Sequence, residues 1–236
     1  MNCPYDLQIV DNCIECSHAK PGFFCGFSPD ALQALNLVSH KTVVPAGAIL
    51  FVEGQEPRGV FVVCSGNVNL STTSREGKGL ILRTAEAGET LGLSAAISNV
   101  AYEVTAETAT PCQISFIERK HVLELLQSFN EIVLQVARCL SHEFQSAYRD
   151  IHDLVLTKSS AGKLARLLLS RADPTDDDSE ARLSSSMTHE EMAQRIGASR
   201  ETVTRLITNL KKKRLIRTDG TVLVIRDRAA LEALAI

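Results

Sequence analysis

The chain has 236 residues, of which 44% are hydrophobic, so it can form one large domain or two smaller domains with real cores. Its net charge is −3, and no stretch approaches the roughly 18 apolar residues that cross a membrane. The first residues, MNCPYDLQIVD, lack the basic start and apolar run of a secretory signal, so we expect a cytoplasmic protein without membrane association.

Residues 1–28 form a leader with little periodicity, and the stretch CIECSHAKPGFFC contains three of the seven cysteines: Cys13, Cys16 and Cys25. An odd number of cysteines in a reducing compartment argues against a disulfide framework. The residues themselves leave several uses open. They are compatible with a tetrahedral zinc site completed by Cys3 or His18, a reversible dithiol of the first two leader cysteines, or no function at all.

Residues 29–120 begin with a short helical stretch, DALQALNLV, and continue with β-rich runs. These runs are TVVP, AILFVEG, GVFVVCSGNVNLSTT, GLILRTAEAGE, YEVTAE and CQISFIE, and Gly, Pro and Asn turns separate them. Short strands at this spacing predict an antiparallel barrel or sandwich. Cys64 lies in one of these runs, and Cys139 lies C-terminal to them. Both are interpreted as packing residues of the core or of a helix seam.

Residues 121–157 show a helical period with apolar positions spaced alternately by four and three residues. This seam consists of Val133, Ala137, Leu140, Phe144, Ala147, Ile151 and Leu154. Three heptads of such spacing are typical of two helices packed side by side, although a helix lying on its own domain would give the same pattern. We therefore predict a dimerisation helix and a two-fold homodimer.

Residues 158–236 predict a winged helix-turn-helix domain, and this range includes a polar stretch at 170–186 that is typical of a surface loop. Thr188 and Glu191 form a capping box at the start of a short helix, and Gly197 ends that helix. A second helix begins after Ser199, a favourable N-cap. The runs LIRT and TVLVI flank Asp-Gly, which predicts a β-hairpin wing.

The exposed face of the second helix is the candidate DNA-reading surface. Its residues are Ser199, Arg200, Glu201, Thr204 and Arg205. Arg pairs with guanine and Glu accepts from cytosine in the major groove. Residues 187–236 contain ten Lys or Arg against six Asp or Glu, a local net charge of +4 in an acidic chain, which favours a polyanionic partner for this end.

The whole pattern closely resembles the CRP/FNR family of bacterial transcription regulators. PAGAILFVEGQEPRGVFVVCSGNVNL is similar to the family's cyclic-nucleotide-binding barrel, and GASRETVTRLITNL to its recognition helix. The resemblance implies an α+β protein with an N-terminal jelly-roll barrel, a long dimerisation helix and a C-terminal winged helix-turn-helix. It also implies palindromic double-stranded DNA with TGTGA-like half-sites, and RNA polymerase, as partners.

The resemblance does not extend to the nucleotide contacts of the CRP-like members. Their Gly-Glu pair for the ribose corresponds to Gly92-Leu93, and their Arg-Ser pair for the cyclic phosphate aligns with Val100-Ala101. A buried phosphate without an Arg lacks its charge-assisted partner. We therefore predict a barrel that does not bind cAMP, and a different small-molecule effector remains the alternative.

The resemblance to FNR implies an oxygen- or nitric-oxide-sensitive [4Fe-4S] cluster, because FNR holds its cluster with three leader cysteines and one barrel cysteine. The matching positions here are Cys13, Cys16, Cys25 and Cys112. The gap between the second and third is longer than in FNR, so Cys3 is a substitute candidate. No Ser-His-Asp set, P-loop, Rossmann fingerprint or HExxH motif is present, so the sequence predicts a regulator and not an enzyme.

Overall fold

The computed structural model describes residues 5, 7, 9, 11–16, 25–74, 76–77, 79–156, 159–173, 181–183, 187–220 and 222–235. The chain divides into two compact units, Met1–Thr72 with Ile81–Ala147, and Thr73–Leu80 with Tyr148–Ile236. Each unit is described by itself. Within the described part of the chain, no helix combines the length and apolar character needed to span a bilayer.

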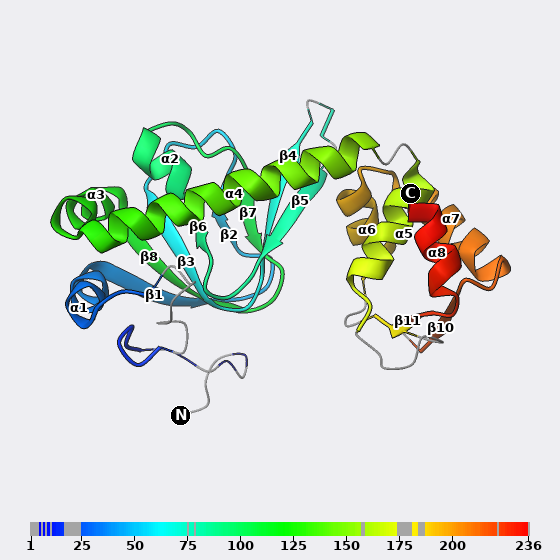
Figure 1. The fold of residues 1–236 in the computed structure, drawn as a ribbon, viewed down its shortest axis with the longest axis horizontal. Helices are drawn as coiled ribbons and strands as arrows, with labels where there is room; N and C mark the ends of the chain where they lie inside the picture. Colours follow the sequence, from blue (N-terminus) through cyan, green and yellow to red (C-terminus); the bar gives the residue numbers. More distant parts are fainter. Residues whose placement is uncertain are drawn as a thin grey trace. The chain divides into compact units, whose positions relative to one another are not determined.

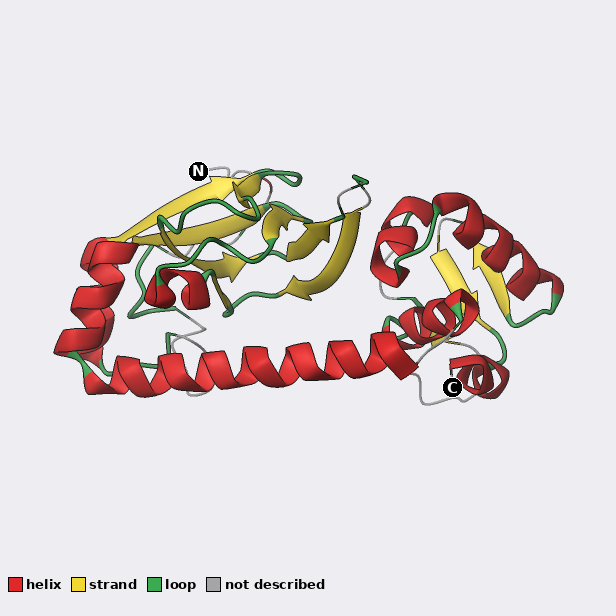
Figure 2. Ribbon diagram, turned by 90° about the horizontal axis from the view of Figure 1, so that it is seen from above, coloured by secondary structure: helices red, strands yellow, loops and turns green. Residues whose placement is uncertain are grey.

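The first unit contains two antiparallel four-stranded sheets, which together form the predicted barrel (Figures 1 and 2). The first sheet has the order β1-β8-β3-β6, with β1 at Ser39–Val44, β8 at Cys112–Glu118, β3 at Gly59–Ser65 and β6 at Thr90–Leu91. The second sheet has the order β2-β7-β4-β5, with β2 at Ile49–Phe51, β7 at Thr105–Thr108, β4 at Val68–Thr73 and β5 at Gly79–Ala85. Every predicted β-rich run contains a strand, whereas the short β6 was not predicted.

The first sheet is buried on both faces, which explains why β3 is almost continuously apolar. Its inner face looks into the barrel, where Phe61 and Val63 pack with Phe51 and Tyr102. Its outer face is covered by the helices of this unit, and Val60 belongs to that second cluster. Side chains on a strand point alternately to opposite faces, so neighbouring residues of β3 enter different cores.

Four helices belong to this part of the chain: α1 (Pro29–Val38), α2 (Leu93–Ser98), α3 (Arg119–Ser128) and α4 (Asn130–Leu156). Each contributes to the cluster on the outer face of the first sheet, α1 through Leu32, α3 through Leu125 and α4 through Val136. Both ribbon views show α4 running alongside the strands of this unit (Figures 1 and 2). The helix over DALQALNLV was predicted, whereas α2 was not.

The second unit is built from helices α5 (Ser160–Ser170), α6 (His189–Ile196), α7 (Arg200–Lys212) and α8 (Arg228–Ala235), and from the three-stranded sheet β10-β11-β9. β10 spans Ile216–Asp219, β11 spans Val222–Ile225 and β9 spans Ala181–Arg182. One cluster containing Leu164, Met192 and Val203 joins its helices. The predicted helix-turn-helix and its wing are therefore present.

Two local expectations for this unit need correction. The stretch 170–186 is not entirely a loop, because β9 pairs with β11 and Ala172 bridges to Leu183. The hairpin turn also lies one residue later than expected. Asp219 pairs with Val222, so the connection begins at Gly220, whose φ of 61° suits glycine.

Candidate functional site

The helix-turn-helix is fixed by local hydrogen bonds that its sequence encodes. Thr188 accepts from the backbone N of Glu191 at 3.1 Å, and the Glu191 carboxylate accepts from the backbone N of Thr188 at 2.6 Å, which completes the predicted capping box. Gly197 ends α6 with a φ of 65°, and the side chain of Ser199 accepts from Thr202 N at 3.2 Å to cap α7. The turn between α6 and α7 is therefore rigidly specified.

The five predicted DNA-reading residues lie at the exposed N-terminal end of α7. They are Ser199, Arg200, Glu201, Thr204 and Arg205. Val203, Ile207 and Leu210, on the opposite side of the helix, are buried against the rest of the unit. The helix thus presents a polar surface of the size and chemistry that enters a major groove.

One residue of this surface is already engaged within the protein, which the sequence pattern did not predict. The Thr204 hydroxyl donates to the carbonyl of Arg200 at 2.9 Å and lies 2.8 Å from Nδ1 of His189. Thr204 therefore joins α7 to the start of α6. In the predicted DNA-reading surface, Thr204 therefore also holds α6 and α7 together.

The wing is tied to the unpredicted strand β9 by charge. Arg182 of β9 forms an ion pair with Asp219 at 3.0 Å, and Arg217 of β10 approaches the same carboxylate at 3.6 Å. Both pairs are solvent-exposed and contribute little stability. Their effect is to hold two guanidinium groups beside Asp219 of the wing.

The three leader cysteines lie together, against the outer face of the first sheet. Cys13 and Cys25 are buried in the cluster that contains Val60 and Val62 of β3, and Cys16 is half-buried. Burial raises the pKa of the Cys25 thiol, and three nearby thiols raise it further: Cys13, Cys64 and Cys16. The thiol of Cys25 thus interacts electrostatically with the other two leader thiols and with Cys64 of β3.

Cys64 was interpreted from the sequence only as a packing residue. It is indeed buried, and burial together with the charges of Cys13 and Cys16 raises its pKa to about 12. Lys41 of β1 acts in the opposite direction on both Cys64 and Cys25. The Cys64 thiol and the Lys41 ammonium group therefore both influence the ionisation of the leader cysteine Cys25.

Cys112, the predicted distant ligand, lies elsewhere. It is fully buried in the barrel interior, in the cluster formed by Phe51 and Val63, whereas the leader cysteines pack on the other side of the sheet. Its thiol donates to the carbonyls of Asn67 and Thr110, at 3.3 and 3.1 Å. Cys112 thus belongs to a different apolar cluster from Cys13 and Cys25, and its part in a metal site stays a prediction.

The gathered thiols do not form a ready-made coordination site. Among the described residues, no group of three or more His, Cys, Asp or Glu side chains is arranged to hold a metal ion. The alternative ligands Cys3 and His18 lie outside the described residues. Cys13, Cys16, Cys25 and Cys64 are of the residue type that ligates an iron–sulfur cluster, which takes four thiolates. Binding would have to draw them together.

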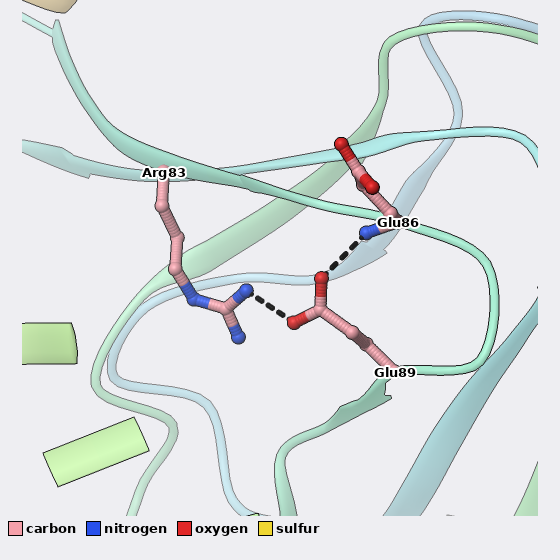
Figure 3. Close-up of polar contacts among 3 residues, drawn as sticks. All are labelled: Arg83, Glu86 and Glu89. Carbon is pink, nitrogen blue, oxygen red and sulfur yellow. Dashed lines mark hydrogen bonds and ion pairs between the residues drawn. The ribbon is translucent and has the colours of Figure 1, made fainter. Parts of the chain in front are cut away.

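A cavity of about 540 Å³ lies in the first unit between the barrel and α4. Its lining includes Gly92, Arg83, Glu103 and Glu143. Arg83, the single Arg or Lys among the lining residues, forms an ion pair with Glu89 at 2.5 Å, and Glu89 also accepts from the backbone N of Glu86 at 2.8 Å (Figure 3). The cavity thus offers carboxylates and a cation already engaged by the protein.

The outer side of α4 carries part of the predicted seam. Val133, Ala137 and Phe144 are exposed. Phe144 also lines the cavity, together with Leu140 and Ala147. The side chains of Ile151 and Leu154 lie outside the described part of the helix. Two further exposed apolar residues on α4, Leu134 and Tyr148, were not included in the sequence pattern.

Comparison with known protein families and proteins gives consistent matches over both units. A cyclic nucleotide-binding domain model matches residues 41–129, and a Crp-like helix-turn-helix domain model matches residues 162–234. The regulatory protein HlyX of Actinobacillus pleuropneumoniae is 30% identical over 82% of this chain and 80% of its own. A CRP-like cAMP-activated global transcriptional regulator of Mycobacterium tuberculosis is 26% identical over 90% and 96%.

Solved structures agree with these relationships. A CRP/FNR family regulator from Thermus thermophilus superposes with a TM-score of 0.66 at 26% identity, over 83% of this chain and 98% of its own. The c-di-GMP responsive global regulator CLP of Xanthomonas campestris has the same fold, with a TM-score of 0.74 at 20% identity, over 84% and 99%. The relatives are transcription regulators and not enzymes. This chain belongs to the CRP/FNR family of transcription regulators, whose members bind DNA and act as dimers.

Proposed function

We propose that this regulator reads palindromic DNA with TGTGA-like half-sites and that an iron–sulfur cluster at the leader thiols, not cAMP, controls it. The exposed N-terminal end of α7 carries the DNA part of the proposal, because Arg200, Glu201 and Arg205 offer the donors and acceptor that guanine and cytosine edges require. Contact between the DNA-bound dimer and RNA polymerase is part of the same proposal.

The gathering of thiols supports the control mechanism. Cys13 and Cys25 are buried together at the outer face of the first sheet. The thiols of Cys16 and Cys64 and the Lys41 ammonium group interact electrostatically with Cys25. A bound cluster would supply sensitivity to oxygen or nitric oxide. The chain's own contribution is to hold the leader against β3, on the face where α4 also packs. Loss of that attachment would change the setting of the dimerisation helix.

The cavity argues against a cyclic nucleotide as the signal, although several relatives are named as cAMP-activated. A cyclic phosphate needs a cation, and the cavity's arginine is already paired with Glu89. Glu103 and Glu143 in the same lining would repel the phosphate. A small-molecule effector of different charge remains the second candidate, since the cavity is large enough to hold one.

The proposal is tested by measuring DNA affinity in defined cluster states. Anaerobically purified protein is divided into cluster-loaded and cluster-free samples. Each sample is titrated into a labelled duplex with two TGTGA half-sites and into a scrambled duplex at fixed salt. We expect tighter binding to the palindrome and different affinities for the two samples, with no change on adding cAMP. Equal affinity for both duplexes would exclude base reading, and equal affinity of both samples would exclude cluster control.

A further inference from the structure

The hydroxyl group of Thr204 is engaged within the protein, although the residue is exposed on the DNA-reading end of α7. Its proton is donated to the backbone carbonyl of Arg200, one turn earlier in the helix, at 2.9 Å. A hydroxyl group has one proton and two lone pairs, so the 2.8 Å contact with Nδ1 of His189 uses a lone pair and the imidazole is the donor. Thr204 therefore has no second proton to donate to a base.

These contacts leave the γ-methyl group as the part of Thr204 that a partner can meet. The hydroxyl of a helical threonine reaches the carbonyl one turn earlier from two χ1 rotamers. In both of them the methyl group takes one of the two χ1 positions, about 180° or about −60°, by which other side chains leave a helix. Because Thr204 is exposed, its methyl group is accessible on the DNA-reading surface.

Thr208 repeats part of this arrangement one turn further along α7. Its hydroxyl donates to the carbonyl of Thr204 at 2.8 Å, and the residue is exposed. Residues four positions apart share one face of a helix, so Arg200, Thr204 and Thr208 form one row. The N-terminal residues of a recognition helix approach the base edges, which favours Thr204 as the threonine that reaches a base.

A methyl group in the major groove has one matching feature among the four bases. Thymine alone carries a C5-methyl group, and the methyl groups of alanine and threonine side chains make apolar contact with it. Thr204 neighbours Arg200 and Glu201 on the helix surface, so the base that it meets lies close to those that the two polar side chains read. In a TGTGA half-site, both thymines of the written strand adjoin guanines.

We propose that Thr204 reads a thymine of the half-site through its γ-methyl group, while His189 and the carbonyl of Arg200 hold its hydroxyl group. This inference rests on the proposed base reading and assigns one more base to it. The arginines and the glutamate of the same surface supply hydrogen bonds to guanine and cytosine. Thr204 adds an apolar contact that only thymine can return.

The test replaces thymine by deoxyuridine, which lacks only the C5-methyl group. The full-length protein is titrated at fixed salt into duplexes of the TGTGA palindrome, in which each thymine position is replaced in turn in both half-sites. Loss of one buried methyl group corresponds to about a four-fold weaker affinity for each half-site. We expect a loss of this size at a thymine position that depends on Thr204.

Three variants identify the group that reads this thymine. Thr204→Ser keeps the hydroxyl and removes the methyl group, so it should bind the thymine and deoxyuridine duplexes equally. Thr204→Val keeps the methyl and removes the hydroxyl group, so it should retain the discrimination. Thr208→Ser removes a methyl group one turn away and is the matched control that should also retain it. Each variant is measured on both duplexes, so any effect of deoxyuridine on the DNA itself cancels between variants.

The outcomes separate this inference from the proposed function. Equal affinity of the wild type for the palindrome and a scrambled duplex would overturn the base reading and the inference together. A preference for the palindrome that no deoxyuridine replacement weakens would overturn only the inference, and this result needs no variant. Discrimination that survives in Thr204→Ser, or is lost in Thr208→Ser instead, would also overturn the assignment to the Thr204 methyl group.

Discussion

The dimer prediction can be examined through one aromatic residue of α4. Phe144 is 64% exposed in the protomer, and an aromatic side chain offers roughly 200 Å², so about 130 Å² is left to be covered. At about 25 cal/mol/Å², that area corresponds to about 3 kcal/mol in each protomer. An alanine side chain would still bury part of this area, which reduces the loss of free energy. The substitution occurs in both protomers of a two-fold dimer, so the loss is counted twice. We expect Phe144→Ala to weaken the dimer by about 4 kcal/mol, roughly a thousand-fold in Kd.

The assay is sedimentation velocity over a dilution series, with the concentration of half-dissociation as the readout. Leu37→Ala is the matched control, because Leu37 is 79% exposed on α1, a helix outside the predicted seam. Comparing variants removes the fixed cost of association from the estimate. Wild-type dimerisation of Phe144→Ala, or an equal loss in Leu37→Ala, would show that this face of α4 is not the interface.

Three further predictions concern DNA reading, pH and capping. Arg200→Ala and Arg205→Ala should each weaken binding to the specific duplex by about 1–3 kcal/mol, and an equal loss on scrambled DNA would argue for phosphate contacts instead. Burial raises the pKa of Glu143 above its ordinary 4.5, so the unfolded chain loses this proton first as pH rises, and the native state loses stability from that pH upward. Glu143→Gln should therefore raise the Tm at pH 7 but not below pH 4.5. The control Glu190→Gln, at an exposed position, should not raise the Tm at pH 7. Thr188→Ala should cost about 1 kcal/mol of unfolding free energy in urea, because it removes the α6 cap, and an unchanged midpoint would count against that role.

The features that the sequence predicted well are those encoded within a few residues of one another. The capping box at Thr188, the αL glycine at Gly197 and the cap at Ser199 are all local, and each is present in the structure. Turn residues between apolar runs likewise located the strands of the barrel. Such signals need no knowledge of distant contacts, which is why the helix-turn-helix could be read from the sequence.

The features that were missed depend on contacts between distant segments. β9 has only two residues and is formed by pairing with the edge of β11. The polar sequence around it gives no local strand signal. The electrostatic interaction of Cys64 with the leader thiols depends on which face of β3 it occupies, and a buried strand that is apolar throughout gives no alternation from which to infer the faces. Cys112 matched the family pattern by position along the chain, and that match says nothing about the face of β8.

The shared face of the first sheet gives a physical route from the thiols to the dimer helix. Cys13 and Cys25 are buried in one apolar cluster with Ile132 and Val136 of α4, and Cys139 of the same helix packs against that cluster. Close-packed cores respond to a volume change by shifting their neighbours, so movement of the leader off β3 alters the packing under α4. A thiol on the inner face, such as Cys112, would lack this direct contact with the helix. Under the proposed cluster control, the position of the leader thiols would therefore matter for regulation as much as the binding of the cluster.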